Sequence, residues 1–135
     1  MEATTGLIIF GHGARDVRWR EPFDRLLAIV EARFPGPVSL AFLDVMTPDL
    51  VTACEDLARR GAHDIVVVPV FFGTGGHMRE DLPKLVAAAR DRCAVPVNTV
   101  GAIGEDHQVL LALADYCLRS LGTEWPPAGV VLSDD

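Results

Sequence analysis

The sequence contains few cysteines, and none of them are paired at a metal-binding spacing. The three cysteines among its 135 residues, Cys54, Cys93 and Cys117, are far apart and form no C-x-x-C pair. Without such a pair a closed structural zinc site is disfavoured. Each cysteine falls on the apolar side of an expected helix, so we expect three buried thiols. Unpaired thiols fit a reducing compartment, and we expect a cytoplasmic protein.

Positive charge and long apolar runs are also scarce. The chain has 12 lysines and arginines against 19 aspartates and glutamates, a net charge of −7, which disfavours nucleic acid as a partner. The first five residues carry no positive charge, and the apolar run after them is too short for a signal peptide or a membrane span. We therefore expect no membrane association. Small anionic ligands stay possible because four arginines adjoin two histidine motifs: Arg15, Arg18, Arg20 and Arg79.

The composition that remains is that of an ordinary globular protein. Half of the residues are apolar and 23% are charged, which argues against disorder. The length predicts one domain over residues 1–122. A tail over residues 123–135 follows, with two prolines and an acidic end. We find no internal repeat.

Strand-like and helix-like segments alternate along the domain. Runs rich in β-branched residues predict strands buried on both faces, and apolar residues at helical spacing predict the helices between them. The expected strands are 7–11, 38–44, 64–72 and 97–100, and the expected helices are about 19–34, 47–61, 79–92 and 106–122. Four successive βα units predict an α/β fold of the flavodoxin-like kind, a three-layer sandwich with a four-stranded parallel sheet and helices on both faces.

Local signals place the helix starts. Thr47 is expected to cap the second helix, with Pro48 at its first position. The third helix is expected to begin near Arg79, with Glu80 and Asp81 at the positive end of its dipole. Asp106 is expected to cap the fourth helix, whose inner face comprises Val109, Leu110, Leu113, Ala114, Cys117 and Leu121.

Two histidines and a carboxylate converge in this topology. His12 follows the first strand, Asp44 closes the second and His77 follows the third, so all three reach the carboxyl edge of the sheet, where such folds bind ligands. Two imidazoles and a carboxylate suit a divalent first-row metal, and imidazole also accepts protons near neutral pH. The nearby glycines, Gly75 and Gly76 among them, allow a flat ligand to approach the backbone.

Other interpretations stay open for single residues. Asp44 could simply cap a turn. The glycine-rich turn Gly73–Gly76 could cradle a phosphate, although it lacks the Lys-Ser/Thr of a P-loop. His63, in a helix-to-strand turn, and His107, at a helix start, are expected to be structural.

The motifs resemble those of the sirohydrochlorin chelatases, the class II tetrapyrrole chelatases. The likeness covers about residues 6–121 and is carried by 11–16 (GHGARD), 41–44 (AFLD), 69–72 (PVFF) and 75–83 (GGHMREDLP). The last stretch is highly specific. The resemblance implies a chelatase-like fold matching one half of the larger, two-lobed members. It also implies a homodimer that forms its cleft by pairing two copies.

The resemblance also implies roles for individual residues. His12 and His77 match the two active-site histidines, which bind metal and help to remove pyrrole protons. Asp44 stands where many relatives have a glutamate that helps to bind metal, and Ala14 replaces a common serine. By position, Arg15, Arg18 and Arg79 are expected to hold the substrate carboxylates, with Gly75 and Gly76 beside the macrocycle.

The activity implied is insertion of a divalent metal into sirohydrochlorin, with the metal as a substrate and no organic cofactor. Cobalt, which leads to cobalamin, is the metal that we expect first. Iron, which leads to siroheme, and nickel stay open because imidazole accepts all three. The alternatives are a carrier that binds metal or tetrapyrrole without catalysis and, less favoured, a nucleotide-binding module.

Overall fold

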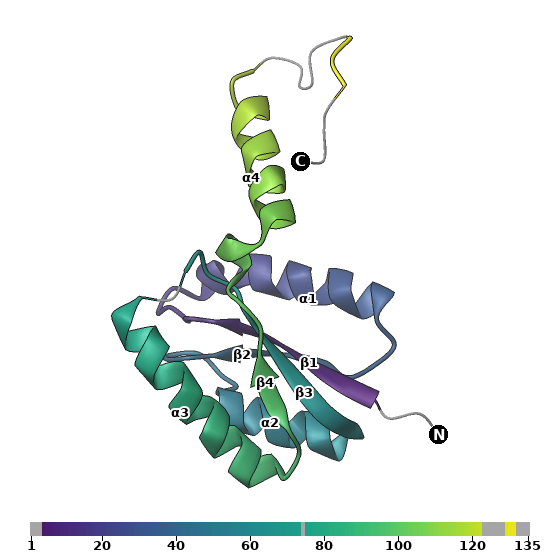
Figure 1. The fold of residues 1–135 in the computed structure, drawn as a ribbon, viewed down its shortest axis with the longest axis vertical. Helices are drawn as coiled ribbons and strands as arrows, with labels where there is room; N and C mark the ends of the chain where they lie inside the picture. Colours follow the sequence, from purple (N-terminus) through teal and green to yellow (C-terminus); the bar gives the residue numbers. More distant parts are fainter. Residues whose placement is uncertain (1–3, 74, 123–128, 132–135) are drawn as a thin grey trace.

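The fold is a four-stranded parallel sheet with helices on both faces, as the sequence predicted (Figure 1). The computed structural model describes residues 4–73, 75–122 and 129–131, without the side chain of His77. The strands lie in the order β2-β1-β3-β4, and every neighbouring pair is parallel. In chain order the elements are β1 (Thr4–Gly11), η1 (Val17–Arg20), α1 (Glu21–Arg33), β2 (Val38–Phe42), α2 (Leu50–Arg59), β3 (Ala62–Pro69), α3 (Gly76–Cys93), β4 (Val97–Thr99), η2 (Ile103–Glu105) and α4 (His107–Arg119).

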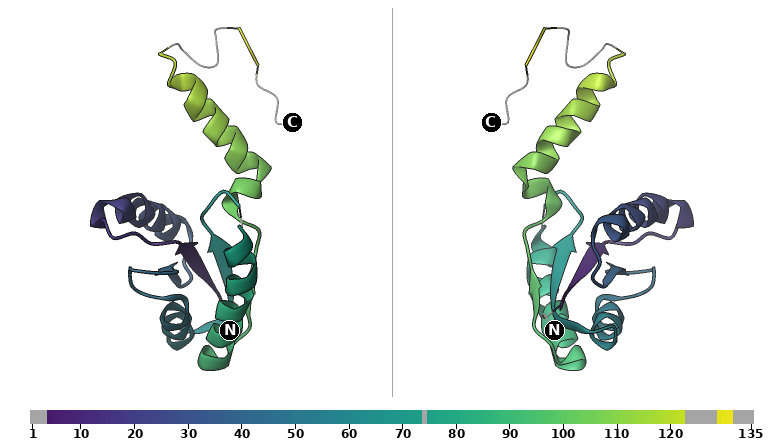
Figure 2. Two further views of the ribbon diagram at one scale, coloured as in Figure 1. Left: turned by 90° about the vertical axis from the view of Figure 1, so that its left-hand side faces the viewer. Right: turned by 90° about the vertical axis from the view of Figure 1, so that its right-hand side faces the viewer.

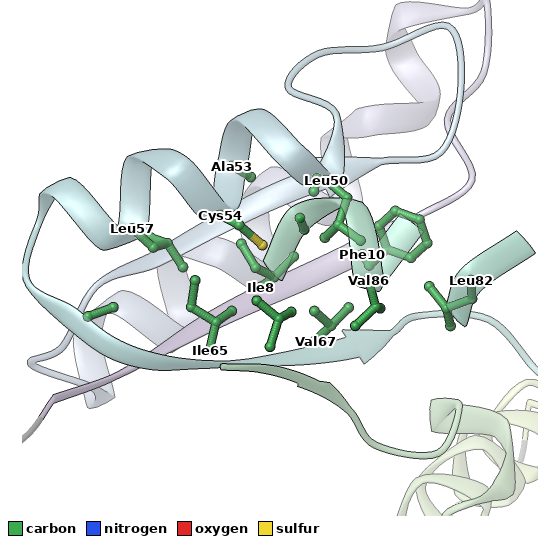
Figure 3. Close-up of a cluster of buried hydrophobic side chains, with 14 of the residues drawn as sticks. Ile8, Phe10, Leu50, Ala53, Cys54, Leu57, Ile65, Val67, Leu82 and Val86 are labelled. Carbon is green, nitrogen blue, oxygen red and sulfur yellow. The ribbon is translucent and has the colours of Figure 1, made fainter. Parts of the chain in front are cut away.

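The main core lies between the sheet and helices α2 and α3. Alternate residues of β1 and β3, such as Ile8, Phe10 and Val67, point to this side and are fully buried against Leu57 and Val86 (Figure 3). The opposite face of β1 and β2 packs against α1 through a second cluster that includes Ile9, Leu40 and Phe42. The two clusters fix the central strands, whose carboxyl ends carry the candidate residues.

Three strands end earlier than expected, and the smallest change is in β4, which stops at Thr99 rather than Val100. The ladder of β2 stops at Phe42 rather than Asp44, so Asp44 lies in the following loop. β3 stops at Pro69 rather than Phe72, and just beyond it the Val70 N–H still bonds the Phe10 carbonyl of β1. Each shortening moves residues from the strand into the loop at the edge.

Helix α3 begins three residues before the expected Arg79. Gly75 precedes its first turn, and the Arg79 N–H bonds the Gly75 carbonyl at 3.0 Å. Glu80 and Asp81 therefore lie beyond the first turn, where their effect on the helix dipole is weaker. Glycine's poor helix propensity explains why the sequence pattern missed this start. His77 consequently lies inside the helix rather than in a turn.

The cap of α2 is Asp49, not Thr47. The Asp49 carboxylate accepts a hydrogen bond from the Thr52 N–H at 2.8 Å. The Pro48 carbonyl accepts a bond from the Phe42 N–H, so Pro48 belongs to the loop that returns from β2 and not to the helix. Two capping residues within three positions made the sequence ambiguous here.

Replacing Asp49 with alanine is expected to lower the free energy of unfolding by about 1 kcal/mol at pH 7. The Thr52 backbone N–H holds the pKa of Asp49 below its ordinary value, so the stabilisation is present above the unfolded pKa of about 3.9 and is lost as the pH falls through the folded pKa. Urea unfolding at pH 7 and pH 3 measures this. Asp49→Asn keeps the cap without the titration. If Asp49→Ala lowered the free energy of unfolding by the same amount at pH 7 and at pH 3, this result would contradict a contribution of the Asp49 charge to stability.

Helix α4 differs most from expectation. Asp106 caps it as predicted, accepting a bond from the Val109 N–H at 3.1 Å, but none of its residues is buried. Figure 2 shows the helix projecting away from the sheet. The expected inner face is therefore not packed against its own domain.

The burial of the three cysteines depends on the helix that carries each of them. Cys54 is buried in the core, and burial raises the pKa of its thiol to about 12. Cys93 is partly buried, whereas Cys117 on α4 is exposed, so the expectation of three buried thiols is wrong for Cys117. All three are free.

In the part of the chain that the structure describes, no helix has the length and apolarity needed to cross a bilayer. Most of the expected tail lies outside the described residues.

Candidate active site at the carboxyl edge

The loops after β1, β2 and β3 are tied together at one edge of the sheet. The Asp44 N–H donates to the His12 carbonyl at 3.1 Å, and the Leu43 N–H donates to Gly11 at 2.9 Å. On the other side, Val70 donates to Phe10 at 2.7 Å. The backbone at His12 is thus hydrogen-bonded to the loop that carries Asp44, and its strand is bonded to β3, which leads to His77. The predicted convergence of the three segments is present in the backbone.

Gly13 makes the close approach of two of these loops possible. Its φ is +90°, a conformation that favours glycine. A side chain here would collide with the backbone carbonyl of Asp44. This position therefore requires glycine on both conformational and steric grounds.

His12 is exposed and lies beside an aromatic ring. Its imidazole centroid is 4.8 Å from that of Phe71, with the planes inclined by 48°. Phe71 is half-buried and packs against the main core, so it can restrict the orientation of the imidazole. The sequence placed Phe71 in an expected strand and in the 69–72 motif, but no role was assigned to this residue.

His77 is the second residue of α3. Its backbone therefore lies where the chain re-enters regular structure after β3, at the same edge of the sheet as His12. Gly75 and Gly76, which precede it, are exposed, and no atom of a described residue lies within 4 Å of a Cβ added at either one. The α3 start thus presents bare backbone to a ligand.

Asp44 is exposed, and its carboxylate accepts a hydrogen bond from the Val45 N–H at 2.9 Å. The Asp44 carboxylate therefore caps its own turn, which is the alternative role that the sequence left open for it. Beside it lies a hollow of about 540 Å³ lined by residues 42–49 and Thr52. Among side chains that the structure describes, no three imidazole, thiol or carboxylate groups gather closely enough to hold a metal ion. A complete, closed metal site is not formed by those side chains.

The expected basic rim is only partly available. The Arg18 guanidinium bonds the Asp16 carboxylate, with its closest contact at 2.7 Å, and both groups are exposed. This pairing lowers the pKa of Asp16 and raises that of Arg18. Arg15 and Arg79 are also exposed, near the loops that carry His12 and His77. Another carboxylate would compete with Asp16 for the Nε and Nη2 donors of Arg18.

An aromatic cluster supports the loop that carries His12. Trp19 and Phe23 stack with centroids 4.8 Å apart, and Phe23 meets Phe42 edge-on at 5.8 Å. Trp19 and Phe23 also press against Gly11, the residue before His12. Arg20 lies over the Phe42 ring and donates to the Thr47 carbonyl at 2.8 Å. Phe23 falls within the helix expected over about 19–34, but nothing in the sequence linked it to this edge.

Curated relatives match most of the chain. The sirohydrochlorin cobaltochelatase of Sulfolobus acidocaldarius is 27% identical over 119 residues, covering 88% of this chain and 94% of that protein. The enzyme of the same name from Saccharolobus solfataricus is 33% identical over 86 residues, covering 64% of this chain and 66% of that protein.

Solved structures have the same fold. The CbiX protein of Marinobacter aquaeolei superposes with a TM-score of 0.80 at 25% identity, covering 87% of this chain and 98% of that one. The sirohydrochlorin chelatase SirB of Bacillus subtilis subspecies spizizenii, in complex with cobalt, gives 0.75 at 25% identity. That match covers 87% of this chain but 51% of SirB, so this chain corresponds to about half of the larger protein. The CbiX family model matches residues 6–119, and the chain therefore belongs to the CbiX family.

Proposed function

We propose that this protein is an enzyme that inserts a divalent metal ion, cobalt in the first instance, into sirohydrochlorin. The observation that carries the proposal is the joining of the His12 loop, the Asp44 loop and the strand leading to His77 at one edge of a CbiX-family sheet. A relative that matches 88% of the chain is named for this reaction. The metal is a substrate of the reaction.

The chemistry assigned to the histidines is metal delivery and proton removal. Insertion replaces two pyrrole N–H protons by one M²⁺ ion, so two protons leave the macrocycle. His12 and His77 are proposed to hold the incoming metal and to accept these protons, because imidazole can serve in either role near neutral pH. A small number of protein ligands favours metal delivery, since a metal ion held by four protein ligands would leave slowly. Asp44 is proposed to assist metal binding from the neighbouring loop.

Substrate carboxylates are proposed to dock on arginines near the edge. Planar guanidinium groups pair with carboxylates in a bidentate manner. Arg15 is favoured over Arg18, whose guanidinium already holds Asp16, and Arg79 is proposed by its exposed position in the first turn of α3. The bare backbone at Gly75 and Gly76 suits close approach of a flat macrocycle.

Replacing Arg79 with alanine is expected to raise the KM for sirohydrochlorin about 10-fold with little change in kcat, as a charge-assisted hydrogen bond to bound substrate is lost. Steady-state kinetics over a range of sirohydrochlorin concentrations measures both constants. Lys84→Ala removes the same charge from an exposed position further along α3 and should leave KM unchanged. Equal KM values for wild type and Arg79→Ala would remove Arg79 from the substrate site.

A homodimer in the cytoplasm is proposed as the working form. This chain matches about half of SirB, which supports a second copy in the place of the missing half. The three free cysteines are consistent with a reducing compartment. Iron and nickel are proposed as further metals, because two imidazoles do not discriminate strongly among these ions.

Turnover separates an enzyme from a carrier. With excess sirohydrochlorin and Co²⁺, an enzyme yields many equivalents of metallated product per protein chain, whereas a carrier yields at most one. Product is counted from its absorbance after the protein is removed. A yield that stops at one equivalent would replace the proposed catalysis by carriage.

A further inference from the structure

The imidazole of His12 is exposed, yet it is supported on one side by an aromatic ring. The backbone of His12 is fixed by the bond from the Asp44 N–H to the His12 carbonyl at 3.1 Å. The imidazole lies against Phe71, with centroids 4.8 Å apart and planes inclined by 48°. The rest of the His12 side chain is open to solvent. A ligand can therefore reach this imidazole from the side away from Phe71.

The Phe71 ring is itself anchored to the domain. It is half-buried, packs against the main core and meets the fully buried Phe10 ring edge-on at 6.3 Å. Its backbone carbonyl accepts a hydrogen bond from the Gly104 N–H at 3.2 Å. The packing at Gly104 is close, because a side chain there would collide with the backbone of Phe72. Phe71 is thus held through both its ring and its backbone.

The plane of an imidazole decides what its nitrogens can do. Each ring nitrogen directs its lone pair or its proton within the plane of the ring. An exposed histidine without a neighbour exchanges among rotamers within nanoseconds, and each rotamer points the nitrogens in a different direction. A contact between two flat rings favours particular relative orientations. An anchored ring beside His12 therefore limits the directions in which His12 can bind a metal ion or accept a proton.

We infer that Phe71 is a positioning residue: it fixes the imidazole plane of His12, so that the nitrogens already point toward incoming metal and macrocycle. The inference rests on the proposed function, because it adds Phe71 to the metal-binding and proton-accepting steps assigned to His12. Phe71 acts through His12 and needs no contact with the substrate. The ring contact and its anchoring in the core carry the inference.

The first test is Phe71→Leu, which keeps apolar volume in the core but removes the flat ring. The kcat for Co²⁺ insertion is expected to fall about 10-fold, because His12 then adopts the productive orientation less often. The KM for sirohydrochlorin should stay within about two-fold of wild type, since no contact with the substrate is lost. Steady-state kinetics measures both constants. An unchanged kcat, with or without a change in KM, would overturn the inference.

Two further variants separate positioning from stability. Val67→Ala leaves a cavity in the same core (Figure 3). It should lower the free energy of unfolding at least as much as Phe71→Leu, with kcat within about two-fold of wild type. Phe71→Tyr keeps a flat ring and should hold kcat within about three-fold of wild type. If either variant, folded by circular dichroism, were as slow as Phe71→Leu, the inference would fail.

Nuclear magnetic resonance tests the ring contact without reference to activity. A nuclear Overhauser effect is expected between the ring protons of Phe71 and the imidazole protons of His12, whose signals are assigned by their absence from His12→Gln. Phe71→Leu should shift these imidazole signals by removing a ring current, while the signals of His63 and His107 stay in place. A wild-type protein without this Overhauser effect would overturn the inference.

Binding of Co²⁺ without sirohydrochlorin gives a readout that is independent of turnover. The Kd for Co²⁺, followed by the absorbance of the bound ion, is expected to rise about 5-fold in Phe71→Leu, because a pre-oriented ligand is lost. It should not rise in Val67→Ala. A wild-type protein that inserts no metal but shows this difference in Kd would refute the proposed function and leave the positioning of His12 standing. Equal Kd values for wild type and Phe71→Leu would overturn the positioning even in an active enzyme.

Discussion

Replacing His77 with alanine is expected to lower the rate of metal insertion by about 10²–10⁴-fold, the usual contribution of a group that transfers protons. The free energy of unfolding should hardly change, because His77 lies in the first turn of α3, at the edge of the sheet. His12→Ala is expected to have an effect of the same order. Initial rates with sirohydrochlorin and Co²⁺, together with urea unfolding, measure the two quantities.

The chain offers two matched controls for these substitutions. His63 lies at the start of β3, at the opposite edge of the sheet, and His107 opens α4. Alanine at either position removes an exposed imidazole without touching the candidate site, so the insertion rate should stay within about two-fold of wild type. Full activity in His77→Ala would remove His77 from the reaction.

Replacing Gly13 with alanine is expected to lower both stability and activity. The added Cβ would collide with the Asp44 carbonyl, at a φ of +90° that alanine adopts only with strain. We expect a loss of roughly 2–4 kcal/mol in the free energy of unfolding. In the protein that remains folded, the insertion rate should fall at least 10-fold, since the His12 and Asp44 loops must separate.

Gly73→Ala is the control for this substitution. No described residue has an atom within 4 Å of a Cβ added at Gly73, so alanine there should change the free energy of unfolding by about 0.5 kcal/mol or less. Unfolding curves and insertion rates are compared for both variants. A Gly13→Ala protein as stable and as active as wild type would contradict the tight joining of the two loops.

The sheet could be predicted because its signals are local and repeated. Each strand is a short apolar run, and each is followed by a helix with periodic apolar residues, so the parallel topology followed from connection rules. Boundaries were less certain where two signals competed. Thr47 and Asp49 both suit a helix cap, and only the hydrogen bond from the Thr52 N–H shows that Asp49 is used.

The placement of α4 could not be predicted from periodicity. The pattern correctly grouped Leu113 and Cys117 on one side of a helix, but it does not state which surface covers that side. Helical periodicity is the same whether a stripe packs on its own sheet or on that of a partner. This explains why Cys117 was expected to be buried and is exposed in the single chain.

The candidate site was predictable in outline. The order of the strands brings the segments that carry His12, Asp44 and His77 to one edge, because all parallel strands end there. Side-chain contacts across the chain were not visible in advance. The Phe71 ring beside His12 and the Arg18 pairing with Asp16 depend on loop conformation, which the sequence pattern does not specify.

The most direct test is an anaerobic absorbance assay of purified protein with sirohydrochlorin and Co²⁺, Fe²⁺ or Ni²⁺ in turn. We predict faster metal insertion than in a protein-free control, fastest with Co²⁺, and loss of this acceleration in His12→Ala and His77→Ala. Rates equal to the protein-free control for all three metals, with wild-type protein that binds sirohydrochlorin, would contradict the proposed chelatase.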